Sequence, residues 1–521
     1  MVDKEGHRRW WKPVHWVKVR RFVQAIALLA FIVLFVWSRR GGWPAGVVNA
    51  PMRLDPLAML GHLLASRTFL AGSALALIIV GLTLLLGRVW CGWLCPLGTL
   101  LDWIPLRKWD NRQPEISSKW RSTKYGLLLT LLTAAVFTNL TLLVFDPLTI
   151  LFRTLSTALW PAVDQIVTGA ETMLYGIPFL QSAVGAFDRL VRPVALPIEP
   201  ALYRYTFLYA GVFLGVLALN LVAPRFWCRY LCPLGALLGL LSKFSLVQRT
   251  VTDRCTQCNV CARACPTGTI DRQKDYASDP GECTMCLECL AACPADAISF
   301  PVRIPRPDWN AYDPNRRHLL ASLGASLAGV GLFQSNLLSS RDHSHLIRPP
   351  GARENGLLHK CIRCGECNRA CPTSAIQPAV VEAGLEGLWT PVLVPRAGYC
   401  DYSCNACGQV CPVQAIPPLS LDEKRERVIG KAYIDENRCI AWADATDCIV
   451  CEEMCPVPEK AIVLEEVEVP TSDGELVTVQ RPRVVRERCI GCGICEYKCP
   501  VNGEAAIRVF VPSDECGVEW F

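Results

Sequence analysis

The chain lacks the sequence motifs of several common redox cofactors. Its 521 residues contain no Cys-x2-Cys-His haem attachment motif, no Gly-x-Gly-x2-Gly nucleotide turn and no phosphate-binding loop. We therefore expect no haem, flavin or nicotinamide site. A strong excess of one charge is also absent: the net charge is +6, and the basic residues cluster beside apolar runs. This distribution gives no reason to expect a nucleic-acid partner.

Cysteine is abundant instead. The chain has 29 cysteines, and all except Cys516 fall into groups of four or into Cys-x3-Cys-Pro pairs. A disulfide framework does not repeat one spacing six times, whereas repeated metal sites do. Each of the six groups of four ends in Cys-x3-Cys-Pro, as in bacterial two-cluster ferredoxins. We predict six [4Fe–4S] clusters rather than structural zinc, which does not require this spacing or the trailing proline.

Apolar residues make up 51% of the chain and are concentrated in its first 240 residues. Four runs approach the length of a bilayer span: 22–37, 68–87, 125–145 and 205–223. Basic residues before the first run and between the second and third predict that these segments are cytoplasmic. A fifth span is expected at 318–336, because a twin-arginine-like pair precedes this weaker apolar run. Buried helices of a soluble protein are the alternative.

The predicted fold is an α-helical membrane domain of four spans plus a fifth, with small α+β ferredoxin domains of the bacterial type on both sides. The expected domains are a membrane domain at 1–245, an inner two-cluster ferredoxin at 246–305, a linker with the fifth span at 306–345, and an outer four-cluster polyferredoxin at 346–521. We expect a multi-pass protein of the cytoplasmic membrane, with residues 246–305 cytoplasmic and residues 346–521 extracytoplasmic.

The apolar part contains an internal repeat. An Asp-Pro-Leu motif, an apolar run and a Cys-x3-Cys-Pro-Leu-Gly motif follow one another twice. Two such units imply a pseudo-two-fold axis along the membrane normal, which would bring the two cysteine pairs together. Three interpretations of the four cysteines stay open: a further metal centre with four thiolate ligands, redox-active dithiols, and a packing role for cysteine as a small apolar residue. The cysteines concerned are Cys91, Cys95, Cys228 and Cys232.

The two Asp-Pro-Leu motifs begin at Asp55 and Asp146. An aspartate before a proline is typical of a helix cap, because proline is well tolerated in the first turn. A second interpretation makes both carboxylates proton acceptors near a quinol pocket, since carboxylates near a membrane are often functional. The cap is the favoured interpretation.

Two groups of four cysteines follow the fourth apolar run. In ferredoxins with this spacing, the last cysteine of each group binds the other cluster. One inner cluster is therefore assigned to Cys255, Cys258, Cys261 and Cys293. The second inner cluster is assigned to Cys265, Cys283, Cys286 and Cys289.

Four more groups of four follow in the C-terminal part. They are Cys361, Cys364, Cys367 and Cys371; Cys400, Cys404, Cys407 and Cys411; Cys439, Cys448, Cys451 and Cys455; and Cys489, Cys492, Cys495 and Cys499. The sequence leaves open which groups exchange their last ligand. A nested scheme pairs the first with the fourth and the second with the third, whereas a sequential scheme pairs neighbours.

These motifs resemble a known pair of protein families. Residues 1–300 resemble the NapH/MauN membrane ferredoxins, and residues 315–515 resemble the NapG/MauM ferredoxins, with the strongest matches at 400–412 and 447–456. In these families the two parts are separate subunits, whereas here they are fused. The resemblance implies a quinol dehydrogenase component, an oxidoreductase that takes electrons from the quinol pool.

The resemblance also implies an extracytoplasmic reductase or cytochrome as the electron acceptor. A variant of this hypothesis uses a cytoplasmic electron donor instead of quinol. The alternative function is an accessory electron donor, or a redox sensor, for the maturation of another redox enzyme.

Overall fold

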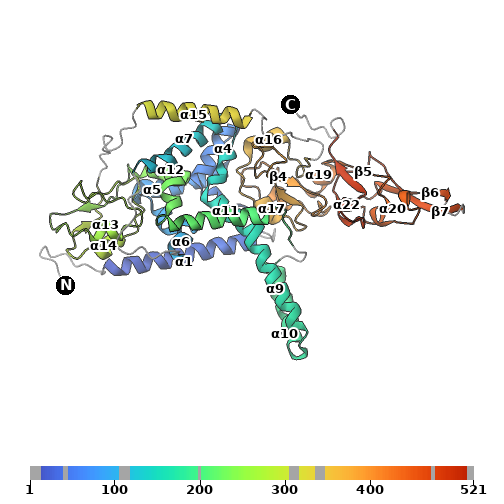
Figure 1. Ribbon diagram of the computed structural model, residues 1–521, viewed down its shortest axis with the longest axis horizontal. Coiled ribbons are helices and arrows are strands. Elements are labelled where there is room, and N and C mark those ends of the chain that lie inside the picture. Colours follow the sequence, from blue (N-terminus) through green and yellow to red (C-terminus); the bar gives the residue numbers. More distant parts are fainter. Residues whose placement is uncertain are drawn as a thin grey trace.

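The computed structural model describes residues 13–38, 45–104, 118–196, 201–303, 316–334, 346–470 and 476–512. Cys516 lies outside these residues. The molecule is elongated, with a body of helices between two ferredoxin parts (Figure 1). We call residues 13–242 the helical body, residues 246–303 the inner part and residues 346–512 the outer part.

The prediction of four spans plus a fifth is wrong. Among the described residues, one helix is long and apolar enough to cross a membrane, at His15–Trp37 within α1 (Pro13–Trp37). The helix expected at 318–336 forms as α15 (Arg316–Gln334), but it does not meet the same criterion. The other apolar helices among the described residues have 10–17 residues and lie at Pro56–Ser66, Ala71–Leu86, Ser122–Val136, Thr206–Leu221 and Pro233–Ser242.

Local backbone signals set where the helices of the body begin and end. Gly87 has a φ of 75° and ends one helix, and Thr138 has a φ of 64° just after another. Proline in a first turn starts a new helix, because it cannot donate a hydrogen bond to the preceding turn. This occurs after Asp55 and Asp146, and also after the second cysteine of each Cys-x3-Cys-Pro motif. The apolar runs predicted hydrophobic helices correctly but overestimated their continuous length.

The two repeats pack against each other in a symmetric way. The aspartates precede α4 (Pro56–Ser66) and α8 (Pro147–Thr154), and the cysteine motifs precede α6 (Pro96–Trp103) and α12 (Pro233–Ser242). Helix α6 contacts α8, and α12 contacts α4. Each helix that follows a cysteine motif therefore packs on the aspartate-capped helix of the other repeat.

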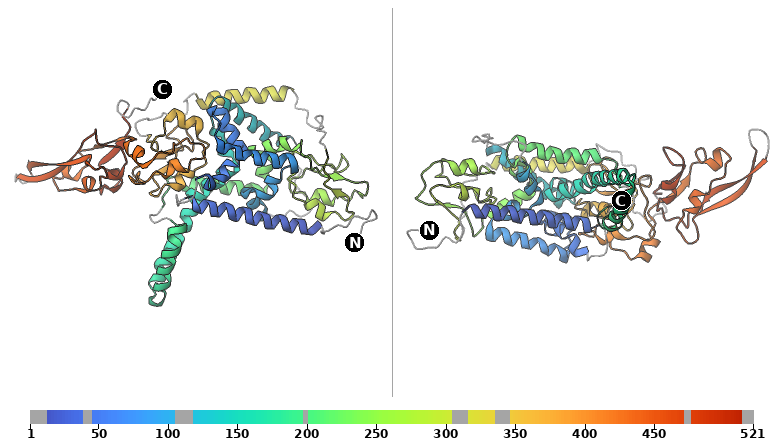
Figure 2. Two further views of the ribbon diagram at one scale, coloured as in Figure 1. Left: turned by 180° about the vertical axis from the view of Figure 1, so that it is seen from behind. Right: turned by 90° about the horizontal axis from the view of Figure 1, so that it is seen from below.

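Other helices surround these four. Helices α1 and α15 lie on opposite sides of the helical body, and the hairpin of α9 (Trp160–Tyr175) and α10 (Gln181–Ala195) projects from it (Figures 1 and 2). The remaining segments of the body are α2 (Ala45–Val48), α3 (Ala50–Arg53), η1 (Ala71–Leu75), α5 (Ala76–Leu86), η2 (Trp90–Leu94), η3 (Ser118–Arg121), α7 (Ser122–Val136), η4 (Thr141–Phe145), η5 (Leu155–Leu159), η6 (Pro178–Leu180), α11 (Thr206–Ala218), η7 (Leu219–Leu221) and η8 (Trp227–Leu231).

The ferredoxin parts combine short helices with antiparallel strand pairs. In the inner part, β1 (Thr250–Val251) pairs with β2 (Ile298–Ser299), and the helices are α13 (Val260–Ala264) and α14 (Glu288–Ala292). In the outer part, the pairs are β3 (Ile376–Pro378) with β4 (Pro391–Leu393), β5 (Lys431–Ile434) with β8 (Ile507–Phe510), and β6 (Ile462–Pro470) with β7 (Leu476–Val484). Its helices are α16 (Glu354–Lys360), α17 (Glu366–Ala370), α18 (Ala406–Gln409), α19 (Leu421–Glu426), α20 (Ile440–Ala443), α21 (Val450–Glu453) and α22 (Ile494–Lys498).

One hydrophobic core joins the helical body to the outer part. It contains Leu57, Leu97 and Leu148 of the body together with Leu357 and Ile362 of the outer part, all buried. The outer part therefore packs on the body rather than being tethered by a linker alone.

Candidate iron–sulfur sites

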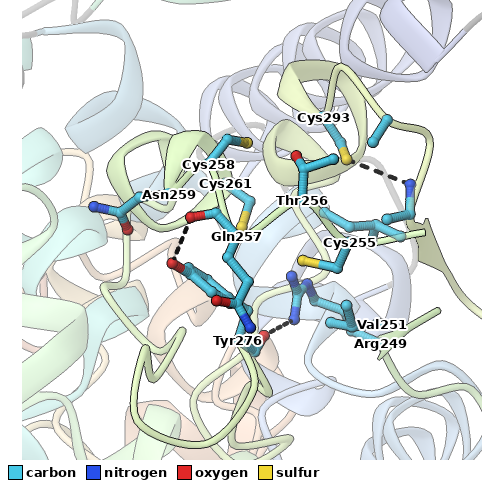
Figure 3. Close-up of a pocket in the computed structure, with 13 residues that line it drawn as sticks. Arg249, Val251, Cys255, Thr256, Gln257, Cys258, Asn259, Cys261, Tyr276 and Cys293 are labelled. Carbon is cyan, nitrogen blue, oxygen red and sulfur yellow. Dashed lines mark hydrogen bonds between the residues drawn. The ribbon is translucent and has the colours of Figure 1, made fainter. Parts of the chain in front are cut away.

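Figure 3 shows a pocket of the inner part that four cysteines line. We call it inner site 1, and its cysteines are Cys255, Cys258, Cys261 and Cys293. The backbone N–H of Ala297 donates to Sγ of Cys293 at 3.4 Å, as is common for cluster-binding sulfurs. The pocket thus takes three cysteines from one group and the last cysteine from the other, which fits a [4Fe–4S] cluster.

The other inner cysteines form a second group, inner site 2, which lies deeper. Burial raises the pKa of Cys283, Cys286 and Cys289, and the charge of Cys265 raises all three further. The last cysteine of the first group therefore lies with the first three of the second. The charge of Cys261 also acts on Cys289, so the two inner sites are neighbours.

In the outer part, the structure brings neighbouring groups together and so favours the sequential exchange scheme. Burial raises the pKa of Cys364 and Cys367, and the charges of Cys361 and Cys411 raise both further. Outer site 1 is thus made of Cys361, Cys364, Cys367 and Cys411. Burial raises the pKa of Cys400, Cys404 and Cys407, and the charge of Cys371 acts on all three. Outer site 2 is thus made of Cys371, Cys400, Cys404 and Cys407.

The last two groups of the chain exchange ligands in the same way. A pocket is lined by Cys455, Cys489, Cys492 and Cys495, which we call outer site 3. The charges of Cys448 and Cys499 both act on Cys439, and the charges of Cys439 and Cys448 both act on Cys451. Outer site 4 is thus made of Cys439, Cys448, Cys451 and Cys499.

The outer sites follow one another in the order 1, 2, 3, 4. The cysteine groups of sites 1 and 2 exchange their last ligands with each other, and so do the groups of sites 3 and 4. The link between the pairs is direct: the backbone N–H of Cys400 donates to the carbonyl oxygen of Cys492 at 2.8 Å, and the charge of Cys400 acts on Cys492. Site 1 lies against the helical body, so site 4 lies at the far end of the row.

The two Cys-x3-Cys-Pro motifs meet inside the helical body. We call this group of four cysteines (Cys91, Cys95, Cys228 and Cys232) the thiol site. Burial raises the pKa of Cys232, and the charges of Cys228, Cys91 and Cys95 raise it further, so all four thiols lie within one group. None of the four forms a disulfide in the structure.

Each motif of the thiol site forms a π-helical turn. The N–H of Cys95 donates to the carbonyl of Trp90 at 2.8 Å, and that of Cys232 donates to Trp227 at 2.9 Å. Single π-helical turns are frequent at functional sites. The structure builds the same rare turn twice, at equivalent positions of the repeat.

The inner part docks directly on the first π-helical turn. The indole N–H of Trp93 donates to the carbonyl of Met285 at 2.9 Å, and Nη1 of Arg88 donates to Gly281 at 2.8 Å. A Cβ on Gly92 would lie 2.1 Å from the carbonyl oxygen of Thr284. In the sequence, Met285 stands between Cys283 and Cys286, two ligands of inner site 2. This contact therefore places inner site 2 beside the thiol site.

Asp55 and Asp146 are both 1% exposed and act as helix caps. Asp55 accepts from the N–H of Leu57 at 2.8 Å, and Asp146 accepts from the N–H of Thr149 at 2.9 Å. The two carboxyl groups also interact with each other, and each has an oxygen that no other described group bonds. Burial, and then the charge of Asp55, raise the pKa of Asp146 well above its usual range. A hydrogen bond between two carboxyl groups requires one proton, so the pair is suited to hold one.

Outer site 1 is fixed to the helical body by arginines. Arg153 of α8 donates to the carbonyl of Trp389 at 3.0 Å and lies over its ring. The guanidinium of Arg369, two residues after a ligand of site 1, stacks on Phe35 at the end of α1 at 4.5 Å from the ring centroid. These contacts hold the first outer cluster site against the body.

The sequence reasoning missed Arg88 and Arg225, which flank the thiol site. Nη2 of Arg88 lies 3.9 Å from Sγ of Cys91, and Nη1 of Arg225 donates to the carbonyl of Cys91 at 3.3 Å. A signal was present, because both repeats read Arg-x-Trp-Cys before the rest of the motif. Extending the repeat by three residues would have found both arginines.

Three profiles of iron–sulfur domains match the chain. A 4Fe-4S binding domain matches residues 68–112 and 206–250, a 4Fe-4S dicluster domain matches 248–294 and 275–372, and another 4Fe-4S binding domain matches 482–503. The ferredoxin-type protein MauM for methylamine utilization of Methylorubrum extorquens is 36% identical over 205 residues, which are 38% of this chain and 89% of that protein. The chain belongs to the MauM/NapG family of ferredoxin-type proteins.

Two further relatives match the chain. The ferredoxin-type protein NapG of Haemophilus influenzae is 32% identical over 39% of this chain and 74% of its own length. The ferredoxin-type protein MauN of Paracoccus denitrificans is 27% identical over 50% of this chain and 79% of its own length. The predicted fusion of a NapH/MauN-type part with a NapG/MauM-type part is confirmed, and the chain is an iron–sulfur electron-transfer protein. No solved structure matches it.

Proposed function

We propose that this chain oxidises quinol at a membrane and passes the electrons through its clusters to an extracytoplasmic reductase or cytochrome. Oxidation of one quinol releases two electrons and two protons, and each cluster carries one electron at a time. The observation that carries the proposal is the shared core of the helical body and outer site 1, because it joins the apolar body to a row of four outer sites. In this proposal all 24 cysteines of the inner and outer sites bind six [4Fe–4S] clusters.

A membrane location is supported by the outer surface of the helical body. Large apolar side chains are exposed on several of its helices, including Phe22 and Leu29 of α1, Leu77 of α5 and Phe207 of α11. Apolar surface of this extent usually marks an interaction with a membrane or a protein. We assign the helical body as a whole to the membrane, because both ferredoxin parts follow α1 in the chain and can lie on opposite faces only if the chain crosses again after α1.

Helix α1 also supports opposite membrane faces for the two ferredoxin parts. Near its start, Arg20 binds Glu288 of the inner part at 2.7 Å, and near its end, Phe35 contacts Arg369 of the outer part. Its basic residues lie in the first turns, at Lys18, Arg20 and Arg21, which favours a cytoplasmic start. We therefore assign residues 246–303 to the cytoplasmic face and residues 346–512 to the extracytoplasmic face. Reporters fused after Lys243 and after Phe521 should report opposite compartments; the same compartment for both would overturn this assignment.

Quinol oxidation needs proton acceptors, and the Asp55–Asp146 pair is the candidate. The pair is buried beside the core that also contains outer site 1, and its two facing carboxyl groups are suited to hold one proton. The decisive experiment mixes the anaerobically purified chain with a quinol analogue and follows cluster reduction by electron paramagnetic resonance. Reduction of the clusters supports quinol oxidation, and its absence, with the clusters loaded, overturns it.

A second candidate function starts from the exposed Cys258 of inner site 1. In this second function the chain is an accessory electron donor, or a redox sensor, for the maturation of another redox enzyme. A cytoplasmic donor would then load inner site 1, whose Cys258 is exposed. Reduction of the clusters by a ferredoxin-type donor, without reduction by quinol, would favour this function.

A further inference from the structure

We propose that the thiol site binds a seventh iron–sulfur cluster, held by Cys91, Cys95, Cys228 and Cys232, that carries electrons between the inner and outer ferredoxin parts. This inference rests on the proposed electron-transfer function and adds the centre that its path lacks. Four thiolates are the ligand set of both [2Fe–2S] and [4Fe–4S] clusters. The centre takes one electron from a neighbouring cluster and gives one to the next, with no net chemistry.

The position of the thiol site is the first argument. The charges of Cys228 in the thiol site and of Cys286 in inner site 2 both act on the guanidinium of Arg225. The two sites are therefore neighbours. On the other side, Cys95 and Cys232 belong to the same hydrophobic core as Cys364 of outer site 1. The thiol site therefore lies between the inner and outer cluster sites.

The length of the gap is the second argument. Fifteen residues of α1 separate Arg20, beside the inner part, from Phe35, beside outer site 1, which is about 22 Å of helix. The rate of electron tunnelling falls exponentially with distance. A redox centre between the two ends divides this long transfer into two shorter ones.

Buried positive charge is the third argument. Arg88 and Lys124 are buried and both approach a single carboxylate, that of Glu282, at 3.6 and 2.6 Å. Buried charges are costly unless they are paired. Arg88 also lies 3.9 Å from Sγ of Cys91. A cluster with four thiolate ligands is anionic and compensates this excess, whereas four neutral thiols used only for packing do not.

Helix N-termini supply the fourth argument. Helices α6 and α12 begin at the proline that follows Cys95 and Cys232, so their positive ends meet at the thiol site. The N–H of Gly235 donates to Sγ of Cys232 at 3.2 Å, and the N–H of Gly98 interacts with Cys95 in the same way. Such N–H donors to sulfur stabilise a cluster and set its reduction potential.

Among the described residues, no group of three or more His, Cys, Asp or Glu side chains is close enough to hold a single metal ion. The thiol site and the six ferredoxin sites share this property.

The test compares the full-length, anaerobically purified chain with a Cys95→Ala/Cys232→Ala variant. The single substitution Cys516→Ala is the control for the loss of a thiol outside every site. We expect the double variant to lose about two or about four irons per chain, for a [2Fe–2S] or a [4Fe–4S] cluster, while Cys516→Ala loses none. Mössbauer spectra should show the loss of one cluster, and the signals of the other six should remain.

Unchanged iron and unchanged spectra in the double variant would overturn the proposal, as would the loss of zinc instead of iron. Neither result would affect reduction of the six other clusters by quinol, so the proposed function would still stand. If the double variant loses all its clusters, the test uses the iron and sulfide content of the wild-type chain instead. Iron and sulfide in excess of six cubanes support the seventh cluster. A content of six cubanes, or a disulfide within the thiol site after rapid alkylation, rejects it.

Discussion

At the scale of residues, Asp55 and Asp146 combine a structural and a chemical property. Both cap helices, as the Asp-Pro motif predicted, and both lie buried beside each other. Replacement of Asp146 with Asn keeps a good helix cap but removes the acidic group. We predict that Asp146→Asn lowers the rate of cluster reduction by quinol about a hundredfold, as expected for loss of a general base. Stopped-flow spectroscopy of the clusters measures this rate.

The same substitution should change the pH dependence of stability. The pKa of Asp146 is raised in the folded protein, so its contribution to stability is complete below the ordinary carboxyl pKa and is lost as the pH rises through the raised value. The thermal midpoint of the wild-type chain should therefore fall with rising pH more steeply than that of Asp146→Asn. If the wild-type chain and Asp146→Asn show equal slopes of thermal midpoint against pH and equal rates of reduction, the role of Asp146 is that of a helix cap only.

The sequence predicted the residues of these sites better than their arrangement. Cysteine spacing identified every group of four, and the repeat predicted that two distant cysteine pairs converge. It did not predict the π-helical turns, whose hydrogen bonds join Cys95 to Trp90 and Cys232 to Trp227. Neither could it choose between the exchange schemes of the outer groups, since both satisfy the same spacing. The contact between Cys400 and Cys492 is a property of the tertiary structure.

At the scale of elements, the docking of the inner part on η2 depends on a glycine. A Cβ at position 92 would collide with the backbone of Thr284, which no side-chain movement can relieve. We predict that Gly92→Ala weakens this docking by about 1–3 kcal/mol, the usual cost of overpacking. Faster hydrogen exchange of residues 281–286, with unchanged iron content, is the expected result.

Gly81→Ala provides the matched control. Gly81 lies in α5, and a Cβ there meets no atom within 4 Å. Alanine in the interior of a helix should stabilise the protein by about 0.5–1 kcal/mol relative to glycine. Equal exchange rates in the Gly92→Ala variant and in this control would mean that the two parts do not pack as tightly as the structure describes.

Helix lengths were the main failure of the sequence reasoning at this scale. The apolar runs were real, but the helices that form in them are shorter: Ala71–Leu86 in 68–87, Ser122–Val136 near 125–145, where Thr138 follows the helix end, and Thr206–Leu221 in 205–223. Hydropathy averages over a window and does not register where a helix starts and ends. Only α1 combines apolar composition with an uninterrupted helix of sufficient length among the described residues.

At the scale of the whole molecule, the order of the sites predicts where electrons enter and leave the outer part. Outer site 1 shares its core with the helical body, whereas outer site 4 lies at the opposite end of the row. Loss of the cluster at outer site 1 should therefore affect the other outer sites differently from loss of the cluster at outer site 4. Cys364→Ser removes a ligand of outer site 1 only, and Cys448→Ser removes a ligand of outer site 4 only.

In Cys364→Ser, outer sites 2, 3 and 4 should remain oxidised after quinol is added, because the entry to the row is interrupted. In Cys448→Ser, outer sites 1, 2 and 3 should still be reduced, because they precede the break. Each variant should lose about four irons per chain, so the comparison is between equal losses. Rapid freezing followed by electron paramagnetic resonance separates reduced from oxidised clusters in both. Reduction of the same sites in both variants would mean that electrons enter the outer part elsewhere than at outer site 1.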